Sequence, residues 1–269
     1  MKDKQLNLLG SPSIETPLKY MGGKKNFYPC FLKYLPSGTK EIISPFFGGG
    51  GLELRLTNLD IRVHGSDFFE PLVNFWKHWI DDADLLIDDL LTFYPLSYEE
   101  RRYYTYTGFK KGSLDFNGDK LDDLRRASLY WNVTSVGWGG TSLKIALSSK
   151  LRNLKTSRFT KFRSWQNKLV TIKHADYRDV LKESNGRLLY LDPPYVDQER
   201  FYQQIGFEEL FDHNELAERL KGVPNWMMSY GDHDLIRDLY KDFNVVDVAW
   251  QNKGKTHNEL LILNINGEK

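Results

Sequence analysis

Short runs of hydrophobic residues, each ending at a polar or turn-forming residue, recur along the chain. Five of these runs predict β-strands. They span residues 41–44, 62–67, 186–191, 226–230 and 260–264. Segments with helical spacing of apolar positions lie between several of them, as at 71–80 and 212–220. Apolar strands that alternate with helices predict an α/β fold with helices on both faces of the sheet, and ligands in such folds bind at the carboxyl ends of the strands.

The regular alternation stops in the middle of the chain, between residues 81 and 165. Residues 81–100 are rich in carboxylates, and the sign of the charge then reverses. No acidic residue occurs between Asp123 and Asp176, and eleven basic residues do. They are Arg125, Arg126, Lys144, Lys150, Arg152, Lys155, Arg158, Lys161, Arg163, Lys168 and Lys173. We interpret residues 81–165 as a mostly helical subdomain inserted into an α/β domain formed by residues 1–80 and 166–269.

The acid-free stretch, in which tryptophans and phenylalanines are interleaved, is the strongest signal in the composition. Lysine and arginine neutralise phosphates, so the stretch predicts nucleic-acid binding that weakens steeply with salt. A solvated positive surface is the alternative, and the formal net charge of the whole chain is only +1. The residues that we expect to contact DNA are Arg125, Arg126, Lys144, Lys150, Arg152, Lys155 and Arg158.

Composition excludes several other classes of protein. With 269 residues, of which 41% are hydrophobic, the chain can form one large domain or a core with a smaller appended domain. The single cysteine, Cys30, rules out a disulfide within the chain and disfavours a thiolate zinc site, and the histidines lack metal-ligand spacing. Because no secretory signal or membrane-spanning run is present, we expect a metal-free cytoplasmic protein.

The loop Asp192-Pro193-Pro194-Tyr195 follows the apolar strand at 186–191. The exocyclic amino nitrogen of adenine is a poor nucleophile because its lone pair is delocalised into the ring. The Asp192 carboxylate and the Pro193 carbonyl, each accepting one N–H, would let that nitrogen become tetrahedral as it attacks a methyl group. The prolines stiffen the loop, and Tyr195 offers a flat face for a flipped-out base. An ordinary strand-ending turn with a packed tyrosine is the alternative.

Three further motifs are suited to binding a cofactor, and each also has an ordinary structural interpretation. The glycines at 48–51 allow a tight turn with close approach of a ligand, or they form a flexible loop. Asp67 ends a predicted strand, where an acidic residue either accepts bonds from ribose hydroxyls or caps the next helix. Residues 17–24 either bring Tyr20 and Lys24 against a ligand or form a surface turn.

In their order along the chain, these motifs resemble those of the Dam-like family of DNA adenine-N6 methyltransferases. The segments at 17–24, 45–50, 65–67 and 174–177 are similar to the family's cofactor motifs, 191–195 matches its DPPY motif, and 253–261 resembles its late strand. The resemblance implies a Rossmann-like, S-adenosylmethionine-dependent α/β core with a DNA-recognition subdomain inserted before the catalytic strand. The implied cofactor-binding residues are Tyr20, Gly22, Gly23, Lys24, Pro45, Phe46, Gly48, Gly50, Asp67, Asp176 and Asp192. The implied catalytic residues are Asp192, Pro193, Pro194 and Tyr195.

Two segments depart from the family pattern. The family usually has an acidic residue before its Pro-Phe-x-Gly loop, whereas this chain has Ser44. We therefore expect that one cofactor contact is missing, so that cofactor binding is weaker or shifts to Lys24 and Asp67. Residues 131–140 resemble the corresponding family segment only loosely, so the resemblance assigns no target sequence.

The motif set predicts a site-specific DNA adenine-N6 methyltransferase that acts on a flipped-out adenine in double-stranded DNA. We expect a bacterial or phage enzyme, monomeric or weakly dimeric, with a restriction nuclease as an expected partner. The choice of adenine over cytosine rests on the family resemblance, because the loop itself suits any exocyclic amino group. The alternatives are a cytosine-N4 or RNA amino methyltransferase, and a catalytically silent DNA-binding relative.

Overall fold

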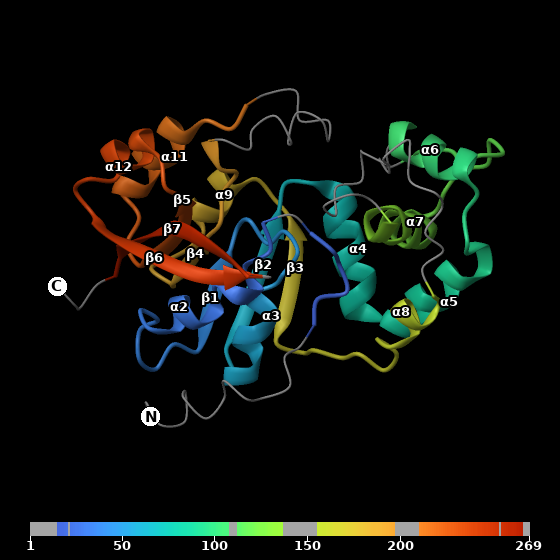
Figure 1. Ribbon diagram of the computed structural model, residues 1–269, viewed down its shortest axis with the longest axis horizontal. Helices are drawn as coiled ribbons and strands as arrows, with labels where there is room; N and C mark the ends of the chain where they lie inside the picture. Colours follow the sequence, from blue (N-terminus) through green and yellow to red (C-terminus); the bar gives the residue numbers. More distant parts are fainter. Residues whose placement is uncertain are drawn as a thin grey trace.

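A mixed β-sheet is the centre of the fold in the computed structural model (Figure 1). The structure describes residues 15–20, 22–107, 112–136, 155–196, 210–252 and 254–265. Within these residues seven strands form the sheet, in the order β3-β2-β1-β4-β5-β7-β6. They are β1 (Glu41–Ser44), β2 (Arg62–Asp67), β3 (Val170–His174), β4 (Leu189–Leu191), β5 (Trp226–Gly231), β6 (Asn244–Asn252) and β7 (Lys255–Asn264). Strands β1 to β5 pair in parallel, whereas β7 lies antiparallel between β5 and β6.

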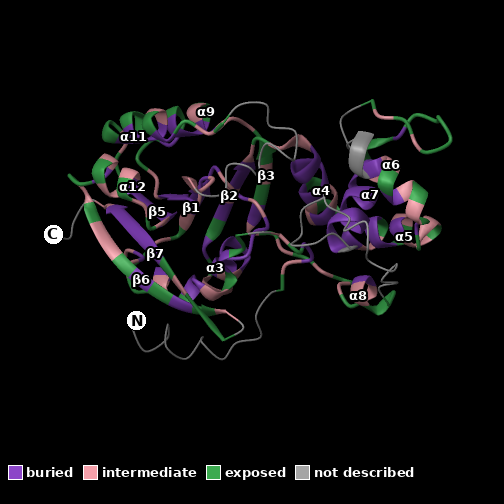
Figure 2. Ribbon diagram, turned by 45° about the horizontal axis from the view of Figure 1, so that its top comes forward, coloured by how far each residue is buried: buried purple, intermediate pink, exposed green. Residues whose placement is uncertain are grey.

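All five strands predicted from the hydrophobic pattern are present. The bounds of β1 and β2 agree with the prediction, β4 is shorter, and β7 begins earlier, at Lys255. The two strands that were not predicted, β3 and β6, are the edges of the sheet. Only Val170 of β3 is buried, and β6 alternates irregularly between buried and exposed residues (Figure 2). An edge strand loses the continuous apolar pattern of a central strand because solvent reaches it.

Two layers of helices cover the sheet, and its side chains alternate between them. Ile42 of β1 belongs to one hydrophobic cluster and Ile43 to the other, as expected for successive strand residues. The first cluster includes residues of α2 (Tyr28–Leu32), α3 (Glu53–Leu56) and α4 (Glu70–Asp81). The second includes residues of α9 (Tyr177–Lys182), α11 (His213–Lys221) and α12 (Asp234–Leu239). The sheet is therefore buried on both faces, and the prediction of a covered α/β sheet is confirmed.

The described residues between α4 and β3 are mainly helical. They form α5 (Ala83–Phe93), α6 (Tyr98–Thr107), α7 (Asp123–Val136) and α8 (Ser157–Thr160), at one end of the molecule beyond α4 (Figure 1). Two short 3₁₀-helices, η2 (Lys24–Asn26) and η3 (Thr57–Leu59), lie outside this segment, before α2 and after α3. The segment agrees with the mostly helical insertion, and its boundaries at residues 81 and 165 stay a prediction.

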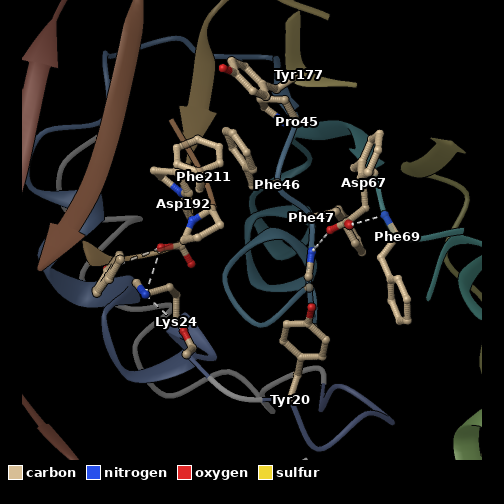
Figure 3. Close-up of a pocket in the computed structure, with 18 of the residues that line it drawn as sticks. Tyr20, Lys24, Pro45, Phe46, Phe47, Asp67, Phe69, Tyr177, Asp192 and Phe211 are labelled. Atoms are coloured by element: carbon tan, nitrogen blue, oxygen red, sulfur yellow. Dashed lines mark hydrogen bonds and ion pairs between the residues drawn. The ribbon is translucent and has the colours of Figure 1, made fainter. Parts of the chain in front are cut away.

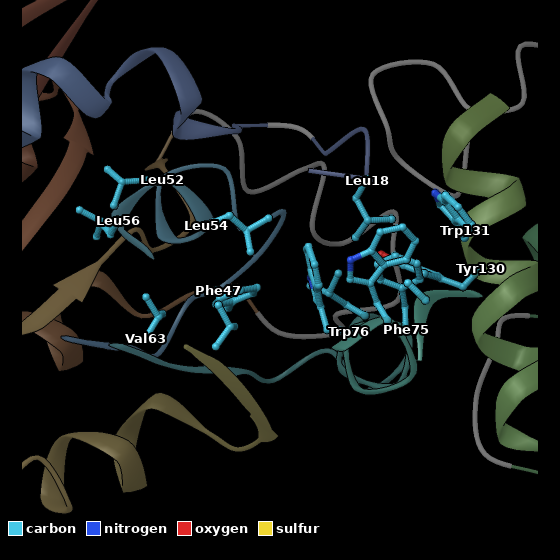
Figure 4. Packing of buried hydrophobic residues seen from close by; sticks show 14 of the residues in the cluster. Leu18, Phe47, Leu52, Leu54, Leu56, Val63, Phe75, Trp76, Tyr130 and Trp131 are labelled. Carbon is cyan, nitrogen blue, oxygen red and sulfur yellow. The ribbon is translucent and has the colours of Figure 1, made fainter. Parts of the chain in front are cut away.

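Aromatic side chains join α7 to α4 (Figure 4), and α8 packs on α7 in the same way. The Trp131 ring lies 5.1 Å from that of Trp79 and 4.9 Å from that of Phe159, measured between centroids, and all three side chains are fully buried. Edge-to-face pairs at such distances stabilise a core beyond the area that they bury. Trp131 and Phe159 of the acid-free stretch therefore fill the core and are not free to stack on bases.

Candidate active site

A cavity of about 530 Å³ lies where the carboxyl ends of the parallel strands meet (Figure 3). The strand order reverses between β1 and β4, which is the point where open α/β sheets bind their ligands. All residues predicted to be catalytic or to bind the cofactor line this cavity. They are Tyr20, Gly22, Gly23, Lys24, Pro45, Phe46, Gly48, Gly50, Asp67, Asp176, Asp192, Pro193, Pro194 and Tyr195.

The glycine loop between β1 and α3 is held in a defined conformation. Gly48 has φ +50°, a left-handed value that glycine adopts without strain, and its N–H donates to Asp67 Oδ2 at 3.0 Å. A Cβ atom on Gly49 would lie 2.5 Å from Cβ of Tyr20, so Tyr20 can approach only because this residue is glycine. The loop, Asp67 and Tyr20 therefore form one wall of the cavity.

Asp67 accepts hydrogen bonds from the glycine loop and from the loop before α4, and it can still accept further hydrogen bonds from a ligand in the cavity. Its Oδ2 accepts from Gly48 N, and its Oδ1 accepts from Phe69 N at 3.0 Å. Burial raises the pKa of Asp67 above its usual range, and the backbone N–H groups oppose that shift. The N-cap residue of α4 is Phe69, so the simple helix-cap interpretation of Asp67 does not hold. Each carboxylate oxygen has further lone pairs for a hydroxyl donor.

Asp192 is oriented through one of its two oxygens. Oδ1 lies 2.9 Å from Lys24 Nζ, accepts from Ser229 Oγ at 2.9 Å and accepts weakly from the Tyr195 hydroxyl at 3.4 Å (Figure 3). Oδ2 makes no hydrogen bond or ion pair within the described ranges. The carboxylate is thus fixed on one side and available to a ligand donor on the other.

Lys24 is a buried cation held between two carboxylates. Its Nζ lies 2.9 Å from Asp192 Oδ1 and 3.9 Å from Glu259 Oε1, and it donates to the Gly22 carbonyl at 3.1 Å. Burial alone lowers the pKa of Lys24, but Asp192 and Glu259 outweigh it and the net shift is upward. Lys24 therefore stays protonated, and its charge opposes the burial that raises the pKa of Glu259.

Ser229 and Glu259 reach this cluster through the register of the sheet. Leu191 pairs with Met228, so the next residues, Asp192 and Ser229, lie side by side. Because β7 runs antiparallel to β5, Glu259 pairs with Gly231 at the end of β5 and so lies at the edge where the parallel strands end. Neither Ser229 nor Glu259 was predicted from the sequence. A glutamate directly before four apolar strand residues was the available signal for Glu259, and nothing local marked Ser229.

The rest of the Asp192 loop is also held by β5. The Tyr195 ring stacks on Tyr230 with centroids 5.4 Å apart, and the Tyr230 hydroxyl donates to the Pro194 carbonyl at 3.3 Å. The Lys24 ammonium lies 4.7 Å from the Tyr195 centroid. In the described part of the chain, the Pro193 carbonyl accepts no hydrogen bond. The loop therefore presents two unused acceptors, Asp192 Oδ2 and the Pro193 carbonyl.

Ser44 is hydrogen-bonded to a buried glutamate that the sequence analysis did not single out. Its Oγ donates to Glu53 Oε1 at 2.9 Å, and Glu53 is 3% exposed and lines the cavity from α3. Burial raises the pKa of Glu53 to about 7, and the charge of Asp192 contributes to the increase. The site therefore has a carboxylate beside Ser44, supplied by the following helix instead of the strand end.

A Glu53→Gln variant should be more stable than the wild-type protein at neutral pH. The pKa of about 7 in the folded state lies above the ordinary 4.5, so the unfolded chain ionises first as pH rises. Wild-type stability is therefore lost progressively between those two values, by on the order of 2–3 kcal/mol. Glutamine keeps an acceptor for Ser44 and removes this loss. Thermal unfolding without ligand at pH 5 and pH 8 measures it, and identical pH profiles for the two proteins would contradict it.

Asp176 and the aromatic residues near it form the opposite wall. Asp176 caps α9 by accepting from Arg178 N at 2.8 Å, and it pairs with the Arg178 guanidinium at 2.9 Å. The rings of Phe46, Tyr177 and Phe211 pack together with centroids 5.3 to 5.8 Å apart (Figure 3). The helix cap gives Asp176 a structural role, and its contact with a cofactor stays a prediction.

The predicted DNA-binding residues differ in what surrounds them. Lys144, Lys150 and Arg152 lie outside the described residues. Lys155 is exposed and Arg158 half-buried. Arg125 is paired with Asp89 at 2.9 Å, and Arg126 is 1% exposed and paired with Glu70 and Asp123 at 2.9 Å. Asp89 of α5 and Glu70 of α4 therefore neutralise part of the positive charge of the acid-free stretch. The burial of Arg126 indicates a structural role for this side chain.

Replacing Arg126 with methionine should lower the free energy of unfolding by about 2 kcal/mol, because a buried side chain and its ion pairs with two partly exposed carboxylates are lost. The matched control is Arg125→Met, whose side chain is 36% exposed and should cost about 1 kcal/mol. Urea unfolding of both variants measures the difference. Equal costs would show that the Arg126 pairs do not support the fold.

Among the described residues, no helix has the length and hydrophobicity of a membrane-spanning segment. No group of three or more histidine, cysteine, aspartate or glutamate side chains among them is placed to hold a metal ion.

Comparison with known proteins gives one family. A sequence profile of the D12 class of N6 adenine-specific DNA methyltransferases matches residues 20–253. The type II methyltransferase M1.LlaDCHI of Lactococcus lactis subsp. cremoris is 25% identical over 249 residues, covering 84% of each chain. The type II methyltransferase M.CviBI of Paramecium bursaria Chlorella virus NC1A is 22% identical over 243 residues, covering 89% of this chain and 92% of its own. The profile extends over β1 to β6, the inserted helices and the whole cavity, and it ends just before β7.

Proposed function

Because the chain belongs to the D12 class of N6 adenine-specific DNA methyltransferases, we propose that it methylates a flipped-out adenine at a specific sequence in double-stranded DNA. The observation that carries this proposal is the arrangement of Asp192. Lys24 and Ser229 hold one carboxylate oxygen, and the other is left for a donor at the edge of the cavity. A carboxylate held in this way is suited to an exocyclic amino group.

The residues around the cavity fit S-adenosylmethionine, which supplies an electrophilic methyl group when it is bound. A volume of about 530 Å³ is within the range of small-molecule sites. Asp67 is placed at the end of β2 to accept bonds from ribose hydroxyls. The Phe46, Tyr177 and Phe211 rings offer a flat apolar wall for a purine. An excess of carboxylates over cations suits a positively charged cofactor.

Asp192 and Pro193 act on the target amino group. Asp192 Oδ2 would accept one N–H and the Pro193 carbonyl the other, so that the nitrogen lone pair is drawn out of conjugation and becomes available as a nucleophile. Lys24 and Ser229 hold the carboxylate in position. Asp192 Oδ2 is also placed to accept the proton that the nitrogen releases after transfer.

Tyr195 and the inserted helices would handle the DNA. The Tyr195 ring, held from behind by Tyr230, offers a surface for the flipped adenine. Residues 81–165 are assigned to target recognition, with Lys155 and Arg158 on phosphates together with Lys144, Lys150 and Arg152. Arg125 and Arg126 are left out of this contact set because carboxylates already bind them.

The two relatives come from a bacterium and a virus and are named type II methyltransferases. We extend the proposal accordingly to an enzyme of a restriction-modification system that acts in a bacterial or virus-infected cell. A restriction nuclease of the same specificity is the proposed partner, and a monomer or weak dimer is the proposed form.

The direct test mixes the purified protein with methyl-labelled S-adenosylmethionine and duplex DNA of mixed sequence. Mass spectrometry of the digested DNA should detect N6-methyladenine. N4-methylcytosine as the product, or label only in an RNA substrate, would assign the loop to one of the alternatives. No transfer across varied duplexes would overturn the proposal. Methylation-sensitive sequencing of DNA from expressing cells then identifies the target sequence.

A further inference from the structure

Glu53 is a buried carboxylate in the cavity wall for which the mechanism above has no use. It is 3% exposed, it lies at the beginning of α3, and its Oε1 accepts from Ser44 Oγ at 2.9 Å. No ion pair to Glu53 occurs within the described ranges. A buried carboxylate without a cation is costly, so this residue marks a place where a positive ligand group would be strongly favoured.

The charged residues that line the cavity also favour a positive ligand group at Glu53. The carboxylates that line it are Glu53, Asp67, Asp176, Asp192 and Asp212, and the cations are Lys24 and Arg178. Lys24 is shared by Asp192 and Glu259, and Arg178 by Asp176 and Glu215. Asp67 accepts two backbone N–H groups. Within the described residues, the hydrogen-bond donors to Glu53 are all neutral. They are the Ser44 hydroxyl and the backbone at Leu52 and Glu53.

Glu53 also lies at the correct end of the cavity for the amino-acid part of the cofactor. The charged residue that acts on it is Asp192, which holds the target amino group in the proposed function. The methionine part must lie on the methyl-transfer side of the ribose, and its α-ammonium carries three N–H donors that require acceptors.

We propose that Glu53 binds the α-ammonium group of S-adenosylmethionine. This inference rests on the proposed function of the cavity as the cofactor site. Ser44 orients the carboxylate through Oε1, so that helix α3 supplies the acidic group that is absent from the end of β1. Ionisation of Glu53 is disfavoured in the empty cavity, and the arriving ammonium reverses this.

Calorimetric titration with two ligands tests this contact without methyl transfer. One ligand is S-adenosylhomocysteine, and the other is its analogue without the α-amino group. The wild-type protein should bind S-adenosylhomocysteine about 10- to 100-fold more tightly than the analogue, as expected for a charge-assisted hydrogen bond. Glu53→Gln should bind both ligands with nearly equal affinity and keep wild-type affinity for the analogue.

Two controls make the outcomes distinct. Glu259→Gln removes a different buried carboxylate and should keep the preference for the ammonium; if it also loses the preference, the total charge of the cavity is responsible and Glu53 is not the contact. An equal loss of both ligands in Glu53→Gln, or no preference in the wild-type protein, overturns the assignment. If Glu53→Gln does not fold, the wild-type titration can still overturn the assignment, because the wild-type protein must show the preference. A wild-type protein that binds neither S-adenosylmethionine nor S-adenosylhomocysteine overturns the proposed function itself, and the inference with it.

Discussion

Replacing Asp192 with asparagine should lower the rate of methyl transfer at least about 10³-fold, while the protein stays folded and binds cofactor within about tenfold of the wild-type affinity. Asparagine has the same shape as aspartate, but its side chain has no negative charge and one of its two polar atoms is a donor. It can present an N–H to the adenine amino group where an acceptor is needed. The transition state then loses the acceptor on which nitrogen attack depends.

Single-turnover transfer, measured with saturating cofactor and DNA, separates this effect from binding. Asp192→Ala is the less suitable variant, because it also removes the side-chain oxygen that accepts from the buried Lys24 ammonium and from Ser229, which asparagine can keep. Calorimetry with cofactor and thermal unfolding of Asp192→Asn serve as controls. A variant that binds cofactor, stays folded and transfers methyl groups at the full rate would show that the assigned mechanism is wrong.

Replacing Lys24 with methionine should lower transfer at neutral pH about 10²-fold or more and lower the free energy of unfolding by about 4 kcal/mol. Without Lys24, Asp192 and Glu259 are two carboxylates in a largely buried cluster with no shared cation. Lys24 is the charge that lowers the pKa of Glu259 against burial, so without it that pKa should rise further. Because Glu259 belongs to the cluster around Asp192, the acidic limb of the pH–rate profile should move to higher pH and activity should partly recover as pH rises.

Lys25→Met is the matched control, because Lys25 is the adjacent residue and is exposed. It should keep the wild-type pH profile and stability. Transfer rates between pH 6 and pH 9, together with urea unfolding of both variants, distinguish the two lysines. A Lys24→Met protein with an unshifted acidic limb would mean that this lysine does not lower the pKa of Glu259.

The central sheet and its motifs could be predicted from the sequence because each of them is a local pattern. Buried strands read as continuous apolar runs, and chemistry that follows a parallel strand is brought to one edge of the sheet whatever its position in the chain. Asp67 and Asp192 were found in this way. The same rule could not find β3 and β6, because solvent reaches the edges of the sheet and the apolar pattern fades there.

The residues that the sequence analysis missed depend on relations between distant segments. Ser229 meets Asp192 only through the register of β4 and β5, and Glu259 reaches Lys24 only because β7 runs antiparallel. Glu53 looks like an ordinary polar residue in a short helix until its burial is known. The pairing of Arg125 was missed for the same reason, since Asp89 contacts it from a helix that the sequence does not place beside it.

Helix α4 joins the inserted helices to the cofactor loop by direct contact. On one side its Trp79 packs on Trp131 of α7, and on the other its Trp76 indole N–H donates to the Gly48 carbonyl at 2.9 Å. Close-packed aromatic side chains transmit displacement because they have little free volume. A displacement of α7 on DNA binding would therefore also displace the glycine loop through α4. Under the proposed function, engagement of the target sequence and tightening of the cofactor site would be thermodynamically linked, each strengthening the other by the same factor.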